Sequence, residues 1–345
     1  MTISRRGFVK SSGLALVSAG LDPLLRLPAF PHSLPVLVCL FQRGAVDGLS
    51  MIVPHGDPMY YKERPRVAVP ARNVVDLDGY FGLHPRLAAL TPLWDNKSLA
   101  VIHAVGSPDL TRSHFDAQDY VESGIPGRKG GDGWLNRYCQ QNREHAGVPY
   151  RAVAFGPRVP RILAGPAPSV TLAYPRGGLG GALQQVAHLI KANVGLQVAF
   201  VESTGWDTHV NQGASDGELA TRLADLGQAL AAFTKDVGPG MRDVVVLTMS
   251  EFGRAIGENG AQGTDHGHGT AVLVLGGPVN GGKVLGRWPG LDPANRFEGR
   301  DVAVTTDYRD LCGEILARHM RATDLESIFP GLPPDPSRFP GAIAV

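Results

Sequence analysis

The sequence predicts an α/β fold, a three-layer α/β/α sandwich with a mostly parallel central sheet. Continuous apolar segments recur along the chain, as expected of strands buried on both faces of a parallel sheet. Amphipathic helical patterns fall between them, and this alternation predicts helices on both faces of the sheet. The 345 residues, 43% of them hydrophobic, are enough to bury a sizeable core.

Each expected element follows from its local pattern. The predicted strands are the apolar segments 34–42, 99–106, 196–203, 243–250 and 271–277. The clearest helix is 215–237, where Leu219, Leu223, Leu226 and Leu230 lie on one apolar stripe at three-and-four spacing. Segments 84–94 and 181–194 carry the same pattern more weakly.

Residues 1–33 have the features of a twin-arginine signal peptide followed by a linker. Arg5 and Arg6 in "SRRGFVK" precede the weakly apolar "GLALVSAGL", which is too short for a stable membrane span. We therefore expect the twin-arginine export machinery as a partner and a periplasmic or secreted protein. Residues 34–345 are expected to form one catalytic domain.

The net charge of +1, without any basic cluster, argues against nucleic acid as a partner. A small-molecule or polymeric substrate is the better expectation.

Polar residues follow four of the predicted strands, at the carboxyl ends where ligands gather in such sheets, and a further polar segment directly precedes the fifth strand. They are Asp47 after the first strand, Ser113 and His114 after the second, Asp207 and His209 after the third, Glu251 and Arg254 after the fourth, and Asp265, His266 and His268 in "GTDHGHG" directly before the fifth. Imidazole and carboxylate are the ligands that zinc-like ions take, so their joint placement predicts a metal site.

Each of these residues taken singly also has an ordinary structural explanation. An Asp after a strand is typical of a turn or a helix cap, and Asp207 with His209 fits a solvated turn. Ser113, with Asp116 three residues later, has the spacing of a capping box. The loop 263–269 also fits a polar turn that is rich in His.

Several motifs resemble one family in order along the chain. They are "RGAVDGLSMIVPHGDPMYY", "SHFDAQDYVESG", "GWDTHVNQG", "SEFGRAIGENG", "GTDHGHG" and "TDYRDLCGEIL". Together they resemble the domain of unknown function 1501 family, within the alkaline phosphatase and sulfatase superfamily. The resemblance implies an alkaline phosphatase-like α/β/α core that holds two divalent ions, usually zinc, or one calcium in sulfatases. It also implies a nucleophile at the start of a helix.

The resemblance assigns roles to some residues and leaves others open. Asp47 sits at the carboxylate ligand position of the first strand, and Ser113 at the position of the nucleophile. Asp207 and His209 resemble the Asp and His ligand pair, although the superfamily usually spaces that pair four apart and the spacing here is two. Glu251 can replace an Asp ligand of the superfamily.

Phe252 occupies a position where relatives carry a histidine ligand, and it cannot bind a metal. His266 could supply the lost imidazole from the neighbouring loop, with His268 as the remaining histidine of the superfamily pattern. Asp265 would then be a ligand, or would orient a histidine through its second ring nitrogen.

The chemistry expected from this pattern is the transfer of a phosphoryl or related group, assisted by one or two divalent ions. Zinc is the first expectation for the metal, and calcium, magnesium or manganese are alternatives. Ser113 would attack in line, and Arg254 could grip a tetrahedral anion, as could Arg43 and Arg112. His114 could bind the metal, act as the general acid, or pack.

Three functions remain open at this point. The first is an exported metal-dependent hydrolase of phosphate or related esters, on a small molecule or a polysaccharide. The second is a hydrolase of a sulfate ester or another carbohydrate substituent. Such an enzyme would work without formylglycine, because no cysteine stands in a Cys-x-Pro-x-Arg signature. The third is a non-catalytic exported metal-binding protein, which the departure at Phe252 favours.

Overall fold

A computed structural model describes residues 34–142, 145–173, 175–331 and 333–344. The expected signal peptide, residues 1–33, lies outside the described residues. Within the described part of the chain, no helix is both long and apolar enough to cross a membrane.

A central sheet with strand order β13-β5-β12-β9-β1-β8-β6-β7 organises the fold, and β14 adds to β5. Its strands are β1 Val36–Arg43, β5 Leu99–Gly106, β6 Ala152–Phe155, β7 Val170–Leu172, β8 Val198–Thr204, β9 Val244–Met249, β12 Thr270–Gly276, β13 Lys283–Leu285 and β14 Thr306–Asp307. All five predicted strands lie in this sheet, and the predicted fold class is confirmed.

The direction of one strand determines where the site is built. Strand β1 pairs in parallel with β8 and β9, whereas β12 runs antiparallel to both β5 and β9. The beginning of β12 therefore lies at the same edge as the carboxyl ends of β1, β5, β8 and β9. This is why the loop 263–269, which precedes β12, reaches the edge at which the other polar segments emerge.

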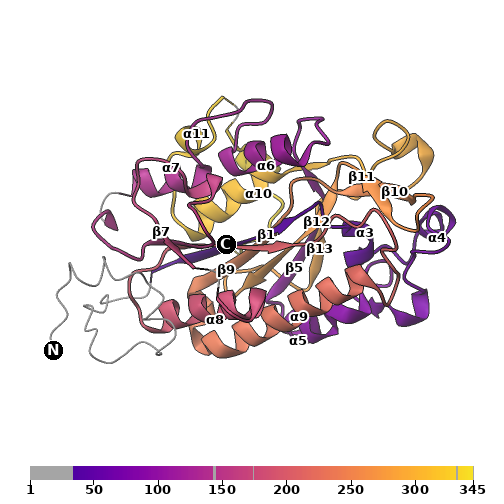
Figure 1. The fold of residues 1–345 in the computed structure, drawn as a ribbon, viewed down its shortest axis with the longest axis horizontal. Coiled ribbons are helices and arrows are strands. Elements are labelled where there is room, and N and C mark those ends of the chain that lie inside the picture. The colour runs from indigo at the N-terminus through magenta and orange to yellow at the C-terminus, as the bar shows by residue number, and fades with distance from the viewer. Residues whose placement is uncertain (1–33, 143–144, 174, 332, 345) are drawn as a thin grey trace.

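Helices cover both faces of the sheet (Figure 1). One layer contains α5 Thr91–Asp95, α8 Gly178–Lys191 and α9 Glu218–Val237, and the other contains α6 His114–Ser123, α7 Trp134–Gln141, α10 Tyr308–Glu314 and α11 Leu325–Ile328. Alternate residues of β1 serve the two cores: Val38 packs in the α8 and α9 layer, and Cys39 packs in the opposite layer.

The predicted helices are present with one modification. Helix α9 buries its leucine stripe as expected, and α8 covers the predicted segment 181–194 as far as Lys191. Segment 84–94 is split into a 3-10 helix, Pro85–Leu90, and the short helix α5. Each of these two pieces has a proline near its start, where a missing N–H costs no helical hydrogen bond.

Smaller elements stand at the site end of the sheet. Strands β10 Arg254–Glu258 and β11 Thr264–His266 form an antiparallel hairpin in which Arg254 is the direct partner of His266. The remaining short elements are α3 Gly48–Met51, β2 Ile52–Val53, α4 Pro58–Glu63, β3 Val75–Asp76 and β4 Gly82–Leu83.

Candidate metal centre

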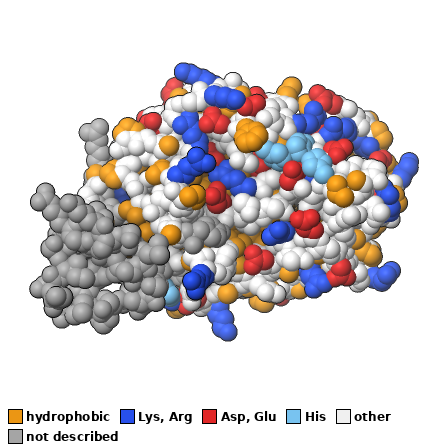
Figure 2. Space-filling model, viewed as in Figure 1, with side chains coloured by type: hydrophobic (Ala, Val, Ile, Leu, Met, Phe, Trp, Pro, Cys, Tyr) orange, Lys and Arg blue, Asp and Glu red, His pale blue; other side chains and the backbone are white. Residues whose placement is uncertain are grey.

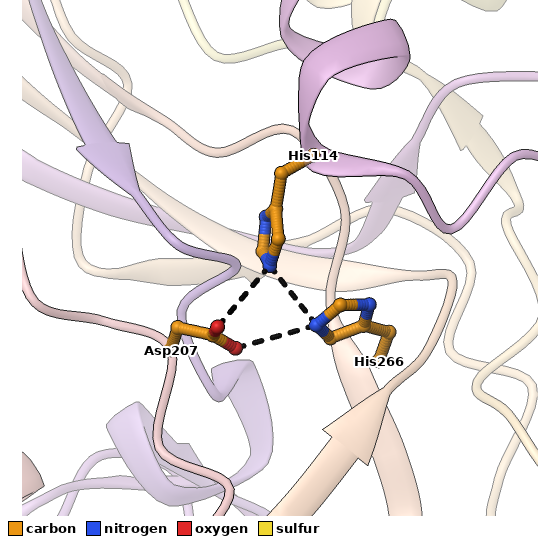
Figure 3. A group of neighbouring side chains, drawn as sticks. All are labelled: His114, Asp207 and His266. Atoms are coloured by element: carbon orange, nitrogen blue, oxygen red, sulfur yellow. Dashed lines mark hydrogen bonds and ion pairs between the residues drawn. The ribbon is translucent and has the colours of Figure 1, made fainter.

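Three side chains from distant parts of the sequence meet at this edge of the sheet. They are His114 at the start of α6, Asp207 in the loop after β8, and His266 at the end of β11 (Figure 3). One donor atom from each lies within 4.8 Å of the other two, as a shared metal ion requires. Among the described residues this is the one such group of histidine, cysteine and carboxylate side chains.

The donor atoms face one another closely. Nε2 of His114 lies 2.9 Å from Nε2 of His266 and 3.5 Å from Oδ2 of Asp207. Nε2 of His266 lies 3.3 Å from Oδ1 of Asp207. The imidazole of His209 joins this set, because its Nε2 is 2.9 Å from Nε2 of His266 and 3.1 Å from Oδ1 of Asp207.

The other ring nitrogen of each histidine has a partner that can only accept a hydrogen bond. Nδ1 of His114 donates to Oε1 of Glu251 at 2.8 Å, and Nδ1 of His209 donates to Oδ1 of Asp265 at 3.1 Å. Nδ1 of His266 donates to the main-chain carbonyl of Arg112 at 2.8 Å. A neutral imidazole carries one proton, so these contacts place that proton on Nδ1 and leave the lone pair on Nε2.

With all three imidazoles in their neutral form, three Nε2 lone pairs face the carboxylate of Asp207. Electron-pair donors at such distances repel one another unless a positive charge lies among them. An imidazole whose outer nitrogen is held by a carboxylate or a carbonyl is the usual form of a metal-bound histidine. The arrangement fits a divalent cation.

Glu251 is buried next to this group and orients the imidazole of His114. Its side chain has no exposed surface, and Oε1 also accepts hydrogen bonds from the main-chain N–H of Gly44 at 2.9 Å and from Nε2 of Gln118 at 2.8 Å. Burial alone would raise the pKa of Glu251, but the hydrogen bonds from His114 and Gln118 outweigh burial and hold the pKa below its ordinary value. The same contact with Glu251 raises the pKa of His114.

Arg254 orients the carboxylate of Asp207 from the protein interior. Nη1 of Arg254 donates to Oδ1 of Asp207 at 2.7 Å, and Nε donates to Oγ1 of Thr264 at 3.2 Å. The guanidinium is fully buried, whereas the side chain of Asp207 is 44% exposed. Burial would raise the pKa of Asp207, but the bond from Arg254 outweighs it, so the pKa is lowered.

Asp47 has different partners from those expected of a metal ligand. Its Oδ2 accepts hydrogen bonds from Nη1 of Arg64 at 2.6 Å, from Oγ of Ser50 at 2.8 Å and from Nε2 of Gln212 at 2.6 Å. Asp47 and Arg64 are both fully buried. Burial would raise the pKa of Asp47, but the charge of Arg64 outweighs it and the pKa is lowered. The guanidinium thus lies on Oδ2 of this carboxylate, whereas Oδ1 is buried and has no hydrogen-bond partner.

His268 also lies apart from the group. Its ring stacks on Phe297, with centroids 4.5 Å apart and planes 18° apart, and burial lowers its pKa. Phe252, at the position where relatives carry a histidine, packs against His114 and His266 with centroids 5.0 and 5.1 Å away. The aromatic ring therefore supports two imidazoles without binding a metal.

Ser113 is the N-cap of α6 and directly precedes His114. Its Oγ accepts a hydrogen bond from the N–H of Asp116 at 3.5 Å, the contact that the capping spacing predicts. Its own N–H donates to Oγ1 of Thr111 at 3.1 Å. The hydroxyl therefore lies at a helix N-terminus, one residue from the metal group.

Two other arginines near the site are occupied by carboxylates. Arg43 binds Glu122 at 2.6 Å and Glu202 at 2.8 Å. Arg112 binds Asp301 and Glu298, each at 2.7 Å. Both guanidinium groups are therefore paired with carboxylates of the protein and are not available to bind an anionic substrate.

Sequence reasoning did not find three residues that support the site. Gln118 lies four residues after His114 on the same helix, and that spacing was a signal that both could reach Glu251. Arg64 and Gln212 gave no signal, because they meet Asp47 only through the tertiary fold.

Residues 184–329 match the model of a family described as "Protein of unknown function (DUF1501)". The resemblance to that family is confirmed over these residues. The matched segment contains Asp207, Glu251 and His266, whereas His114 precedes it. No curated protein matches the chain.

Solved structures match most of the chain at low sequence identity. A protein of the alkaline phosphatase superfamily from Vibrio parahaemolyticus is 12% identical, with 91% of this chain and 79% of that chain covered and a TM-score of 0.45. The C-terminal periplasmic domain of EcEptC from Escherichia coli, in complex with Zn, is 12% identical over 72% of this chain and 74% of that chain, with a TM-score of 0.42. The soluble domain of lipooligosaccharide phosphoethanolamine transferase A from Neisseria meningitidis is 12% identical over 72% and 81%, with a TM-score of 0.38.

Proposed function

We propose that the chain is an exported metal-dependent hydrolase of phosphate or related esters, with one divalent ion held by His114, Asp207 and His266. The observation that carries this proposal is the convergence of Nε2 lone pairs on the carboxylate of Asp207, each imidazole being oriented through its Nδ1. The ester chemistry rests on the resemblance of the sequence motifs to the alkaline phosphatase and sulfatase superfamily.

The donor set favours zinc. Imidazole nitrogens with one carboxylate suit zinc, whereas calcium and magnesium prefer a shell made of oxygens. One ion is proposed, although the superfamily usually holds two, because Asp47 already binds the guanidinium of Arg64. His209 is the candidate for a further ligand, since its Nε2 lies beside both His266 and Asp207.

The residues of the chain would divide the work between binding and attack. A bound divalent ion polarises an ester oxygen and offsets the charge that develops during transfer. Glu251 and Arg254 keep His114 and Asp207 in place. We propose Ser113 as the nucleophile, because its hydroxyl lies at the N-terminus of α6, where the partial positive charge of the helix favours an oxyanion.

Metal analysis of the mature protein, exported by its own signal, tests this proposal. We expect one zinc-like ion per chain in the wild type and none after His114→Ala combined with His266→Ala. His55→Ala is the matched control, because His55 is partly buried, pairs with Asp76 and does not belong to the ligand group, so the variant should leave the metal content unchanged. Full stoichiometry in the double variant would exclude the proposed ligands.

A second function is favoured by the position of His209. Four protein ligands around zinc form a closed site of the structural kind, whereas catalytic sites keep one position open. If His209 binds permanently, the chain is a metal-binding protein without hydrolase activity. Chromogenic phosphate and sulfate esters, assayed on the metal-loaded protein, separate the phosphate hydrolase, the sulfate hydrolase and this non-catalytic alternative.

A further inference from the structure

Large hydrophobic side chains are exposed at few places in the described part of the chain. They are Leu110 at 56%, Phe115 at 88%, Val159 at 45% and Val210 at 57%. Three of the four are close in sequence to residues of the candidate metal centre. Phe115 follows His114, Val210 follows His209, and Leu110 precedes by two residues the Arg112 carbonyl that holds His266.

These three residues are attached to well-anchored backbone. Phe115 lies in the first turn of α6. Val210 is followed by Asn211, whose N–H donates to the carbonyl of Ala261 at 2.9 Å. Leu110 lies between Asp109 and Thr111, which are joined by a hydrogen bond of 2.8 Å from the Thr111 N–H to Oδ1 of Asp109. Their exposure is therefore a property of the folded surface.

Apolar and charged side chains both border the histidines on this face of the molecule (Figure 2). Figure 2 shows hydrophobic side chains beside the pale blue histidines on this face. Two arginines next to His266 already have carboxylate partners: Arg112 binds Glu298 and Asp301, and Arg300 binds Asp301 at 2.9 Å. A substituent with several negative charges would find no unpaired guanidinium in these two arginines.

We propose that Leu110, Phe115 and Val210 form an apolar rim that binds the alkyl or aryl part of the substrate. The substrate class is then an amphiphilic ester, with its anionic group at the metal and its apolar group on the rim. Removing an apolar group from water favours binding by about fourfold for each methylene that becomes fully buried. This inference rests on the proposed function and specifies its substrate.

Binding of alkylphosphonates, which lack a hydrolysable ester bond, tests the rim without relying on turnover. Ethyl-, butyl- and hexylphosphonate are titrated into the zinc-loaded mature protein by calorimetry, below the concentrations at which they form micelles. We expect the dissociation constant to fall several-fold with each step in chain length. Phe115→Ala should flatten this dependence, and Val210→Ala should weaken it.

Val159→Ala is the matched control, because it removes an exposed hydrophobic side chain on the loop after β6 and should keep the full dependence on chain length. Circular dichroism and zinc content verify that each variant is folded and loaded. Equal binding of all three phosphonates by the wild type would overturn the rim and leave the proposed function standing. Failure to bind any phosphonate would contradict both.

A membrane surface is the competing occupant of the rim. Sedimentation with vesicles of phosphatidylcholine and phosphatidylglycerol measures it directly. Association with vesicles that is lost in Phe115→Ala, without any chain-length dependence for the phosphonates, would overturn the proposal in favour of a membrane contact. We expect no such association.

Discussion

Asp47 and Arg64 form an ion pair of 2.6 Å in which neither side chain has exposed surface. The pair belongs to a chain of hydrogen bonds that continues through Gln212 to Thr264, and from Thr264 to Arg254 and the carboxylate of Asp207. The carboxylate that the resemblance assigns to a metal is thus joined to the candidate metal centre through a chain of side-chain hydrogen bonds. In this structure its Oδ2 neutralises the buried charge of Arg64.

Asp47→Ala should therefore destabilise the fold without removing a ligand. The substitution leaves the charge of Arg64 buried and unpaired, which costs about 3–5 kcal/mol. Urea unfolding of the metal-free protein measures this loss, and metal analysis of the fraction that stays folded should still give one ion per chain. Loss of an ion with unchanged unfolding would identify Asp47 as a ligand after all.

Gly44→Ala should disturb the metal centre through the backbone. Gly44 has φ of +115°, and a Cβ there would lie 2.6 Å from the main-chain nitrogen of Asp207. Its N–H also binds Glu251. We expect the variant to lose about 1–3 kcal/mol of stability. We also expect weaker metal binding, which is measured by competition with a chelator.

Gly79→Ala is the control for Gly44, because Gly79 also has positive φ, +84°, but a Cβ there meets nothing within 4 Å. It should cost stability and leave metal affinity intact. Equal metal affinity in the two variants would show that the contact with Asp207 does not matter.

Glu251→Gln should weaken metal binding without unfolding the protein. The amide keeps one oxygen for the N–H of Gly44, but it removes the negative charge that orients His114. Loss of such an orienting partner costs roughly 10–100-fold in metal affinity. Competition with a fluorescent chelator measures it, and Glu298→Gln, a change at an exposed carboxylate, should leave the affinity near that of the wild type.

Replacing Arg5 and Arg6 together by lysine should block export and leave unprocessed protein in the cytoplasm. The prediction rests on "SRRGFVK" ahead of a short, weakly apolar stretch. Fractionation with antibody detection locates the protein. Normal export of the double lysine variant would indicate a different route.

The fold could be predicted because its strands are continuous apolar segments, and a segment such as 244–249 is fully buried in the central sheet. The strand pattern also predicts that the polar segments meet at one edge of the sheet, and Asp207 and His266 do meet there. The contacts of Asp47 and His268 could not be predicted in this way. Arg64 reaches Asp47 only after folding, and β11 ends at His266, so the position of His268 depends on the turn beyond it.

Ser113 is the residue on which an enzymatic function depends most, and two substitutions separate its two roles. As a helix cap alone, Ser113→Ala should cost about 1 kcal/mol of stability, Ser113→Thr should recover most of that loss, and turnover should persist in both. As a nucleophile, Ser113→Ala should lose most of the rate while zinc content and folding stay near those of the wild type. We expect the second outcome, because the hydroxyl lies at the start of α6, one residue before His114. Rates on a chromogenic phosphate ester, taken with metal analysis of the same samples, decide between them. Turnover at the wild-type rate in Ser113→Ala would leave Thr111, whose hydroxyl binds the N–H of Ser113, or water at the metal group as the attacking group.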